Sequence, residues 1–311
     1  MTPPAALAAS ANPTERGLVA DALAIARYHI VLVAMSACVA FGWIETGERP
    51  WLIALVCGLD WFLINLMNRV TDVAEDAANG IAGTARVARG KRALTIGAWA
   101  LMIGSFVATH LVWPALTPWR VAVQLIGLGY NYPIVPTLRG LSRFKEMYFF
   151  KNFGSSVLFV LTCFVYPLAA AERVAPWATI ACLVLFFVPF ELTYEILYDL
   201  RDLEGDRREG VPTYPVVHGP LVARRIIDAL LVASAGVLVV GLATGAIGLR
   251  EGLMLAAPAT QLAFYRPRFA RGLTAHDCIV LTHLGTAQVS LWIAGTWLWS
   301  LAGLPENVYL R

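Results

Sequence analysis

The chain has 311 residues, of which 58% are hydrophobic and only 14% are charged. Soluble domains carry about 25% charged residues, and the mean hydropathy here is +0.65, so water-soluble and disordered proteins are excluded. The net charge of +3 provides no large basic surface, which argues against nucleic acid as a partner. The composition favours a protein that crosses a lipid bilayer many times.

The first 20 residues are rich in Pro, Ala and Ser and lack the basic and apolar regions of a signal peptide. We expect a flexible N-terminal segment over 1–20 and one polytopic membrane domain over 21–311. A spanning helix needs about 20 mostly apolar residues, and nine segments meet or approach that length. These predicted spans are 24–44, 51–69, 93–113, 119–137, 149–170, 176–198, 224–246, 252–266 and 277–302.

The basic residues predict an orientation for these spans. Of the 24 Lys and Arg residues, 19 lie near the N-terminus or in the alternate loops 69–92, 138–151, 199–225 and 266–274. Cytoplasmic loops of membrane proteins carry an excess of Lys and Arg. We therefore expect the N-terminus and these loops in the cytoplasm, and an odd number of spans places the C-terminus outside.

Two acidic motifs follow predicted spans that enter the cytoplasmic side. The first acidic motif, 68–76, closes the second span, and the second acidic motif, 199–206, closes the sixth. An offset of 130 residues superposes their aspartates, so that Asp72 falls on Asp202. This pattern indicates a weak internal duplication, in which each half of the chain contributes one acidic site.

The spacing within the motifs places oxygen-bearing side chains on one helix face, because residues i and i+4 are neighbours there. The first stripe consists of Asn68, Asp72 and Asp76, and the second of Asp199, Asp202 and Asp206, extended into the span by Glu191 and Glu195. Two carboxylates 4 Å apart repel by roughly 4 kcal/mol at an effective dielectric of 20. Mg²⁺ relieves such repulsion and bridges carboxylates to phosphates. For either stripe alone, a solvated helix end paired with Arg is an equally good interpretation.

The cytoplasmic loops bring Arg and Lys close to both acidic stripes. Carboxylates beside cationic side chains suit a diphosphate, held by metal on one side and by ammonium or guanidinium groups on the other. The apolar helices above the stripes would enclose a dry cavity for a hydrocarbon tail. The combination points to an isoprenyl diphosphate as the substrate.

At these motifs the chain resembles the UbiA-type intramembrane prenyltransferase superfamily, whose motifs have the forms NDxxDxxxD and DxxDxxxD. Asn68, Asp72 and Asp76 match the first form, and the second motif is followed by Gly210 and Thr213, as in the family. The resemblance implies an all-α integral membrane protein, with nine transmembrane helices around a central cavity and two pseudo-repeated halves.

Two positions depart from the family pattern. Arg69 stands at the second position of the first motif, where the family has Asp, and this removes one metal ligand. The family also tends to have a YxxxK motif after the fourth span, and no Lys follows Tyr132 in that register. Arg139, Lys145 or Lys151 would replace that lysine, with Lys151 the first choice because it lies where the loop re-enters the membrane.

The resemblance implies Mg²⁺-dependent ionisation of a prenyl diphosphate to an allylic cation, followed by transfer to an aromatic or lipid acceptor. Asp72, Asp76, Asp202 and Asp206 would be catalytic. The implied metal ligands are Asn68, Asp72, Asp76, Asp199, Asp202 and Asp206. The implied substrate-binding residues are Asn68, Lys145, Lys151, Arg207, Arg208, Tyr194, Tyr198 and Glu195.

Two other functions compete with prenyl transfer. A membrane terpene cyclase would ionise the same diphosphate at the same metal site and use no external acceptor. A secondary transporter would also contain repeats and intramembrane acids, but here the acidic motifs lie at the ends of helices. Asp60, in the middle of the second span, is expected either to face the cavity or to form an interhelical hydrogen bond.

Overall fold

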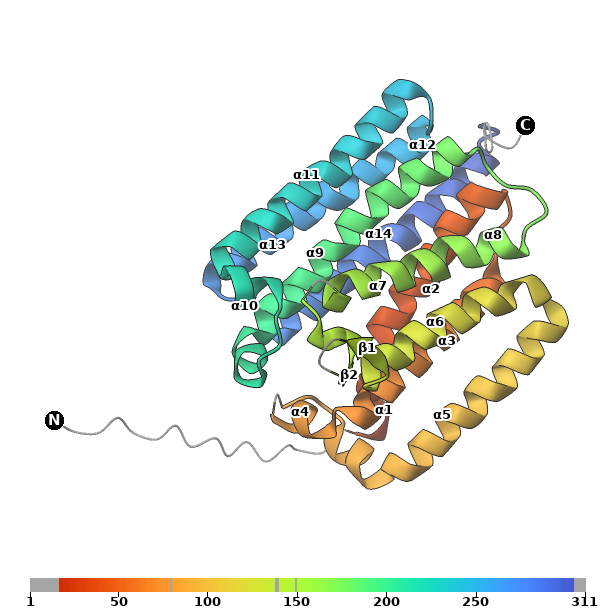
Figure 1. Ribbon diagram of the computed structural model, residues 1–311. Coiled ribbons are helices and arrows are strands. Elements are labelled where there is room, and N and C mark those ends of the chain that lie inside the picture. The colour runs from red at the N-terminus through yellow and green to blue at the C-terminus, as the bar shows by residue number, and fades with distance from the viewer. Residues whose placement is uncertain (1–16, 79, 138–139, 149, 305–311) are drawn as a thin grey trace.

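A computed structural model describes residues 17–78, 80–137, 140–148 and 150–304. The described chain is a helical bundle with one short β-hairpin, which confirms the predicted all-α membrane fold. Figure 1 shows α5 along one edge of the bundle and α11 with α13 along the opposite edge. The predicted flexible segment was too long, because helix α1 already begins at Leu18; residues 1–16 lie outside the described residues.

The described residues of the first half form six helices, two 3₁₀ turns and the hairpin. The helices are α1 (Leu18–Ile25), α2 (Tyr28–Thr46), α3 (Trp51–Thr71), α4 (Val73–Ala78), α5 (Thr84–Val112) and α6 (Thr117–Asn131), with a 3₁₀ turn at Pro114–Leu116. Strands β1 (Val135–Thr137) and β2 (Gly140–Ser142) pair antiparallel, with Pro136 opposite Leu141. A 3₁₀ turn over Phe144–Glu146 then leads back towards the bundle.

The second half is helical throughout. Its helices are α7 (Phe150–Val160), a π-helical turn (Leu161–Val165), α8 (Tyr166–Ala170), α9 (Trp177–Glu209), α10 (Tyr214–His218), α11 (Pro220–Thr244), α12 (Leu249–Gly252), a 3₁₀ turn (Leu253–Leu255), α13 (Ala256–Arg271) and α14 (Ala275–Leu301). All five cysteines are buried free thiols.

Within the described ranges, seven helices are long and apolar enough to cross a membrane. They are α2, α3, α5, the continuous α7–α8 segment, α9, α11 and α14. Helices α6 and α13 correspond to two further predicted spans but have only 15 and 16 residues. The multi-pass membrane fold is therefore confirmed, and the number of nine spans stays a prediction.

Several helices begin or end away from the predicted span boundaries, as three of them show. The first span is divided at Arg27, whose φ of 45° places a non-glycine residue in the left-handed region between α1 and α2. The fourth span ends at Asn131 because Tyr132 precedes Pro133 and adopts an extended conformation, as residues before proline do. The sixth span does not end before Asp199, since α9 continues to Glu209 and is closed by Gly210 at φ 70°.

The core of the bundle is apolar and closely packed. The largest cluster of buried side chains joins α2, α3, the α7–α8 segment and α9. Helices α6 and α3 pack closely at Gly127 of α6. A Cβ atom added to Gly127 would lie only 2.6 Å from a carbon of Ile64 in α3. Glycine at this position lets α6 approach α3 directly.

Asp60 faces a buried polar network, not the cavity. Arg120 on α6 donates through Nη2 to Asp60 Oδ1 at 2.5 Å and through Nε to Oδ2 at 2.9 Å, and both side chains are fully buried. Gln124 and Tyr166 also donate to Asp60, at 2.9 and 2.8 Å. The interhelical interpretation is therefore correct, and Arg120, counted among the few basic residues of the opposite face, binds inside the bundle.

We expect Asp60→Ala to destabilise the protein strongly, because it leaves the Arg120 guanidinium buried without its counter-ion. Breaking a buried ion pair by removing one partner costs about 3–5 kcal/mol. Thermal unfolding in detergent should show the loss as a lower midpoint. The double variant Asp60→Ala, Arg120→Leu should recover part of it; an unchanged midpoint in Asp60→Ala would contradict a stabilising role for the network.

Candidate active site

The two acidic motifs line a single cavity of about 1220 Å³. Figure 1 shows α4 and the carboxyl end of α9, which carry the motifs, at the same end of the bundle. Beyond the acids, most of the lining is aromatic or apolar, and it includes Phe41, Trp61, Phe159, Phe186, Phe187 and Phe190. The cavity therefore has a charged mouth and an apolar shaft, as the sequence predicted.

The first acidic motif continues as helical turns past the end of α3. Backbone hydrogen bonds from Asp72 N to Asn68 O and from Asp76 N to Asp72 O, at 2.9 and 2.8 Å, keep the predicted i, i+4 stripe. Asn68 Nδ2 donates to Asp72 Oδ2 at 2.5 Å. Arg69, fully buried, forms an ion pair with Asp76 and donates to the Ala82 carbonyl at 2.5 Å. Arg69, which replaces the aspartate of the family motif, thus places a buried positive charge beside Asp76.

The second acidic motif lies on the last turns of α9. Lys151 Nζ lies 2.9 Å from Asp199 Oδ1 and 3.1 Å from Asp206 Oδ2. Asp202 forms an ion pair with its neighbour Arg201, whose guanidinium carbon lies 4.7 Å from the centre of the Tyr198 ring. Each carboxylate of this motif therefore has a cationic neighbour.

One lysine from the loop region serves each motif. Lys145, in the 3₁₀ turn after the hairpin, donates to Asp72 at 2.7 Å and to Glu75 at 2.8 Å. Lys151, at the start of α7, bridges the aspartates of the second motif and is only 14% exposed. Lys145 and Lys151 thus neutralise one acidic row each, and both line the cavity.

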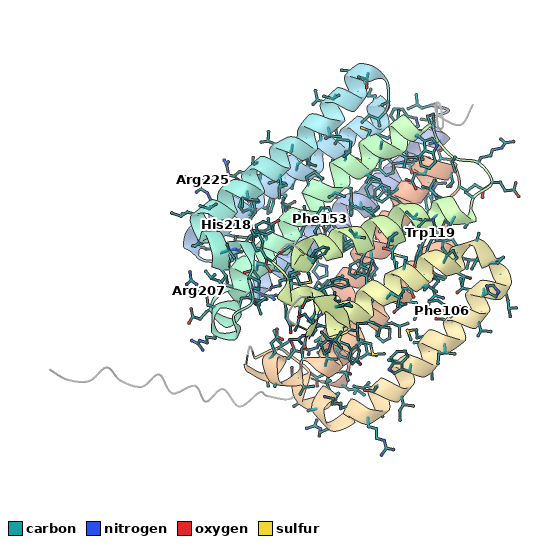
Figure 2. All side chains as sticks on the ribbon, in the orientation of Figure 1. Phe106, Trp119, Phe153, Arg207, His218 and Arg225 are labelled. Atoms are coloured by element: carbon teal, nitrogen blue, oxygen red, sulfur yellow. The ribbon has the colours of Figure 1, made fainter. Side chains whose placement is uncertain are left out.

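The other predicted substrate residues divide into two groups. Tyr194, Tyr198 and Glu195 line the cavity, and Gly285 leaves room for Tyr194, whose hydroxyl would lie 2.8 Å from an added Cβ. The structure does not bring Arg207 and Arg208 to the others: both are exposed, and Arg208 pairs with Glu204. Figure 2 shows Arg207 at the edge of the molecule. Arg139 lies outside the described residues.

Sequence reasoning missed three polar residues beside the motifs. Asn152 is fully buried and donates to Asp199 at 2.7 Å. Ser155 donates to Glu195 at 2.9 Å, and Arg143 approaches Asp72 at 3.2 Å. A signal for Ser155 was present, because it follows Lys151 by four residues and so shares its helix face.

The side chains of the motifs offer only oxygen ligands to a metal ion. Asn68 and five aspartates line the mouth, and carboxylate and amide oxygens are the ligands that hard divalent cations prefer. Across the described ranges, however, no three His, Cys, Asp or Glu side chains converge closely enough to hold a metal alone, because Lys and Arg lie among them. Burial raises the pKa of the Asp76 carboxyl, and Arg69 beside it opposes this rise. The oxygen atoms of these side chains suit Mg²⁺, and a bound substrate would supply the remaining ligands.

The model of the UbiA prenyltransferase family matches residues 30–292, which include both acidic motifs and most of the bundle. The chain belongs to the UbiA prenyltransferase family. The resemblance seen in the motifs is thereby confirmed. Its fold is shared with solved members: a UbiA homolog from Archaeoglobus fulgidus bound to DMAPP and Mg²⁺ superposes with a TM-score of 0.67 at 15% identity, covering 87% of this chain and 96% of that one.

A second structure of the same Archaeoglobus fulgidus homolog, bound to GPP and Mg²⁺, has a TM-score of 0.66 at 16% identity, over 88% of this UbiA-family chain and 97% of that one. Two digeranylgeranylglyceryl phosphate synthases match a shorter stretch. The Haloquadratum walsbyi protein is 30% identical over 98 residues, or 31% of this chain, and the Methanopyrus kandleri protein 35% identical over 100 residues, or 32%. The matched stretches span only about a third of those relatives, 34% and 35%.

Proposed function

We propose that this protein transfers an isoprenyl group from a prenyl diphosphate to a hydrophobic acceptor, and that Mg²⁺ is its cofactor. One observation carries the proposal: two acidic rows, each with its own lysine, meet at the mouth of one cavity whose shaft is aromatic. The Archaeoglobus fulgidus homolog of the same fold was solved with DMAPP or GPP and Mg²⁺, which agrees with this ligand class.

In this proposal the residues at the mouth bind the diphosphate and those of the shaft bind the tail. Asn68, Asp72, Asp76, Asp199, Asp202 and Asp206 would hold Mg²⁺. When bound, Mg²⁺ neutralises charge on the departing diphosphate. Lys145 and Lys151 donate hydrogen bonds to the phosphate oxygens, and the ring faces of Tyr194 and Tyr198 stabilise positive charge on the allylic carbon.

The shape of the cavity favours transfer over cyclisation. Its volume of about 1220 Å³ exceeds the roughly 300–1,000 Å³ of common small-molecule pockets, so it has room for an acceptor beside a prenyl chain. Polar side chains also reach into the shaft, including Glu191, His29 and Gln288. A cyclase that shelters a reactive cation has no need of these polar side chains, whereas they can bind the attacking polar group of an otherwise hydrophobic acceptor.

The excess of Lys and Arg near the motifs supports a cytoplasmic active site. Lys145 and Lys151, from the basic loop after the fourth predicted span, lie at the cavity mouth, and loops rich in such residues remain in the cytoplasm. We therefore propose that the mouth opens towards the cytoplasm, where water-soluble diphosphate can leave.

The test is a product assay on the purified full-length protein in nanodiscs. Radiolabelled DMAPP, GPP and geranylgeranyl diphosphate are each incubated with Mg²⁺, with and without an acceptor: 4-hydroxybenzoate or geranylgeranylglyceryl phosphate. The proposal expects an acceptor-dependent prenylated product. A cyclic hydrocarbon or terpene alcohol formed equally well without acceptor would identify a cyclase and overturn it.

Lys151→Gln tests the proposed diphosphate contact. Gln remains polar but is one atom shorter than Lys and has no charge, and a hydrogen bond to a charged group contributes about 1.5–3 kcal/mol. We expect the KM for the prenyl diphosphate to rise at least about tenfold, or kcat to fall by as much. Reduced expression with normal kinetics in the surviving protein would instead show that Lys151 only anchors α7.

A further inference from the structure

Glu191 and Glu195 lie one helical turn apart on α9 and share a single hydroxyl. Ser155 Oγ on α7 lies 2.9 Å from Glu195 Oε1 and 3.2 Å from Glu191 Oε1. Ser156 donates to the other oxygen of Glu191. Glu191 is 5% exposed and Ser156 1% exposed, while Glu191, Glu195 and Ser155 all line the cavity. Two carboxyl groups are thus joined through one serine.

The contacts of Ser155 with Glu191 and Glu195 are consistent with one proton shared by the two carboxyl groups. The Ser155 hydroxyl carries a single hydrogen, so it donates to only one carboxylate at a time. The second contact is a hydrogen bond only if that carboxyl is protonated and donates to the serine oxygen. Two carboxylates ionised together in a buried place also repel each other strongly. The geometry therefore fits a pair that holds one proton and passes it across Ser155.

The pair lies at the boundary between the mouth and the shaft. Asp199 is one turn further along α9, at the mouth, and Phe190 and Phe187 lie on the shaft side. The proposed reacting carbon lies at this boundary, because the diphosphate is held at the mouth and the prenyl tail in the shaft. An acceptor that attacks this carbon would bring its hydroxyl or ring hydrogen close to the glutamates.

We propose that the Glu191–Ser155–Glu195 group takes up the proton that the acceptor loses during prenyl transfer. The proposal rests on the proposed function. The allylic C–O bond breaks and its electron pair leaves with the diphosphate; the acceptor forms the new bond to carbon, and its proton passes to the ionised carboxylate of the pair. The proton already held stays on the other carboxyl, so that both glutamates end neutral; when one proton is released at the mouth, Ser155 lets the remaining proton pass between them.

The surroundings of the pair set the pH at which it holds one proton. Five titratable groups face Glu195: Tyr130 of α6, Lys151 of α7, and Glu191, Tyr198 and Asp199 of α9. Glu191 faces Glu195 and the two serines. Lys151 brings a positive charge to this group of residues, and Asp199 brings a negative one. A Gln in place of Glu191 or Glu195 has no carboxylate and therefore cannot take up the proton.

Infrared spectroscopy of the purified protein in nanodiscs tests the shared proton without any substrate. We expect one carbonyl-stretch band of a protonated carboxylic acid that is lost in Glu191→Gln and also in Glu195→Gln, because either amide removes the repulsion that retains the proton. Ser155→Ala should shift this band, and Glu172→Gln, an exposed residue in the loop before α9, should not. A separate band lost in each variant, or no band that responds, would overturn the proposal.

Kinetics test the role of Glu191 in transfer. With radiolabelled GPP and each of the two acceptors, Glu191→Gln should lower kcat about 100-fold, since general acid–base catalysis contributes about 10²–10⁴-fold, and should flatten the acid side of the pH profile. Its KM for GPP and its Mg²⁺-dependent affinity for geranyl thiolodiphosphate should stay at the wild-type values, as in Glu172→Gln. A fall in kcat below about tenfold overturns the proposal alone. Failure of the wild-type protein to bind the analogue overturns the proposed function, and this inference with it.

Discussion

Chelation of divalent cations is expected to abolish turnover completely. The charges at the mouth give the reason. Six carboxylates there line the cavity, and ion pairs join them to five cationic side chains: Arg69, Arg143, Lys145, Lys151 and Arg201. The mouth is thus close to neutral before a substrate enters. A bound diphosphate adds negative charge that these residues cannot balance, so its departure requires added cations.

The measurement is product formation in excess EDTA, followed by restoration with Mg²⁺. Because Lys and Arg already pair with the acids, the protein should keep its thermal unfolding midpoint in EDTA. This control separates loss of catalysis from unfolding. Full turnover in EDTA would show that the lysines and arginines alone can balance the charge of the diphosphate, and the proposed requirement for Mg²⁺ would be wrong.

Asp72→Asn and Asp202→Asn are expected to lower kcat/KM by at least about 100-fold each, or about 2.7 kcal/mol of barrier. Asn retains the size of Asp and one oxygen but loses the charge. Asp72 is 6% exposed and contacts Asn68, Arg143 and Lys145, so the variant also leaves Lys145 with Glu75 as its carboxylate partner. Both variants should fold, because Arg143 and Lys145 keep Glu146 and Glu75 as partners and the Arg201–Asp202 pair is partly exposed to solvent.

Glu204→Gln is the matched control for Asp202→Asn. Glu204 lies two residues away on α9, but its side chain is 70% exposed and pairs with Arg208. If activity depends on ligands that face the cavity, Glu204→Gln should behave as wild type. Equal losses in both variants would mean that general charge near the motif matters, and the assigned ligand roles would be wrong.

The sequence predicted the features that depend on local periodicity. The i, i+4 spacing placed Asn68, Asp72 and Asp76 on one face, and the structure keeps that stripe although α3 ends at Thr71. Apolar length predicted most spans. The end of the fourth span was missed, although Pro133 carried the signal that terminates α6.

Partners far apart in the chain were beyond prediction from one sequence. Asp60 and Arg120 are 60 residues apart and belong to different helices, so nothing local marks them as a pair. The same holds for Ser155 and Glu191, which meet only because α7 packs against α9. The left-handed Arg27 also had no signal, since glycine or asparagine is the usual residue in that conformation.

The most direct test of the central claim is an experimental structure of the full chain with Mg²⁺ and geranyl thiolodiphosphate, an analogue that cannot ionise readily. The account predicts that the diphosphate lies between Asp72 and Asp202 with metal ions beside it. Lys145 and Lys151 should turn towards the phosphates, and the geranyl tail should lie among Phe159, Phe187 and Phe190. A diphosphate bound away from the two acidic rows, or a tail outside this shaft, would contradict the account.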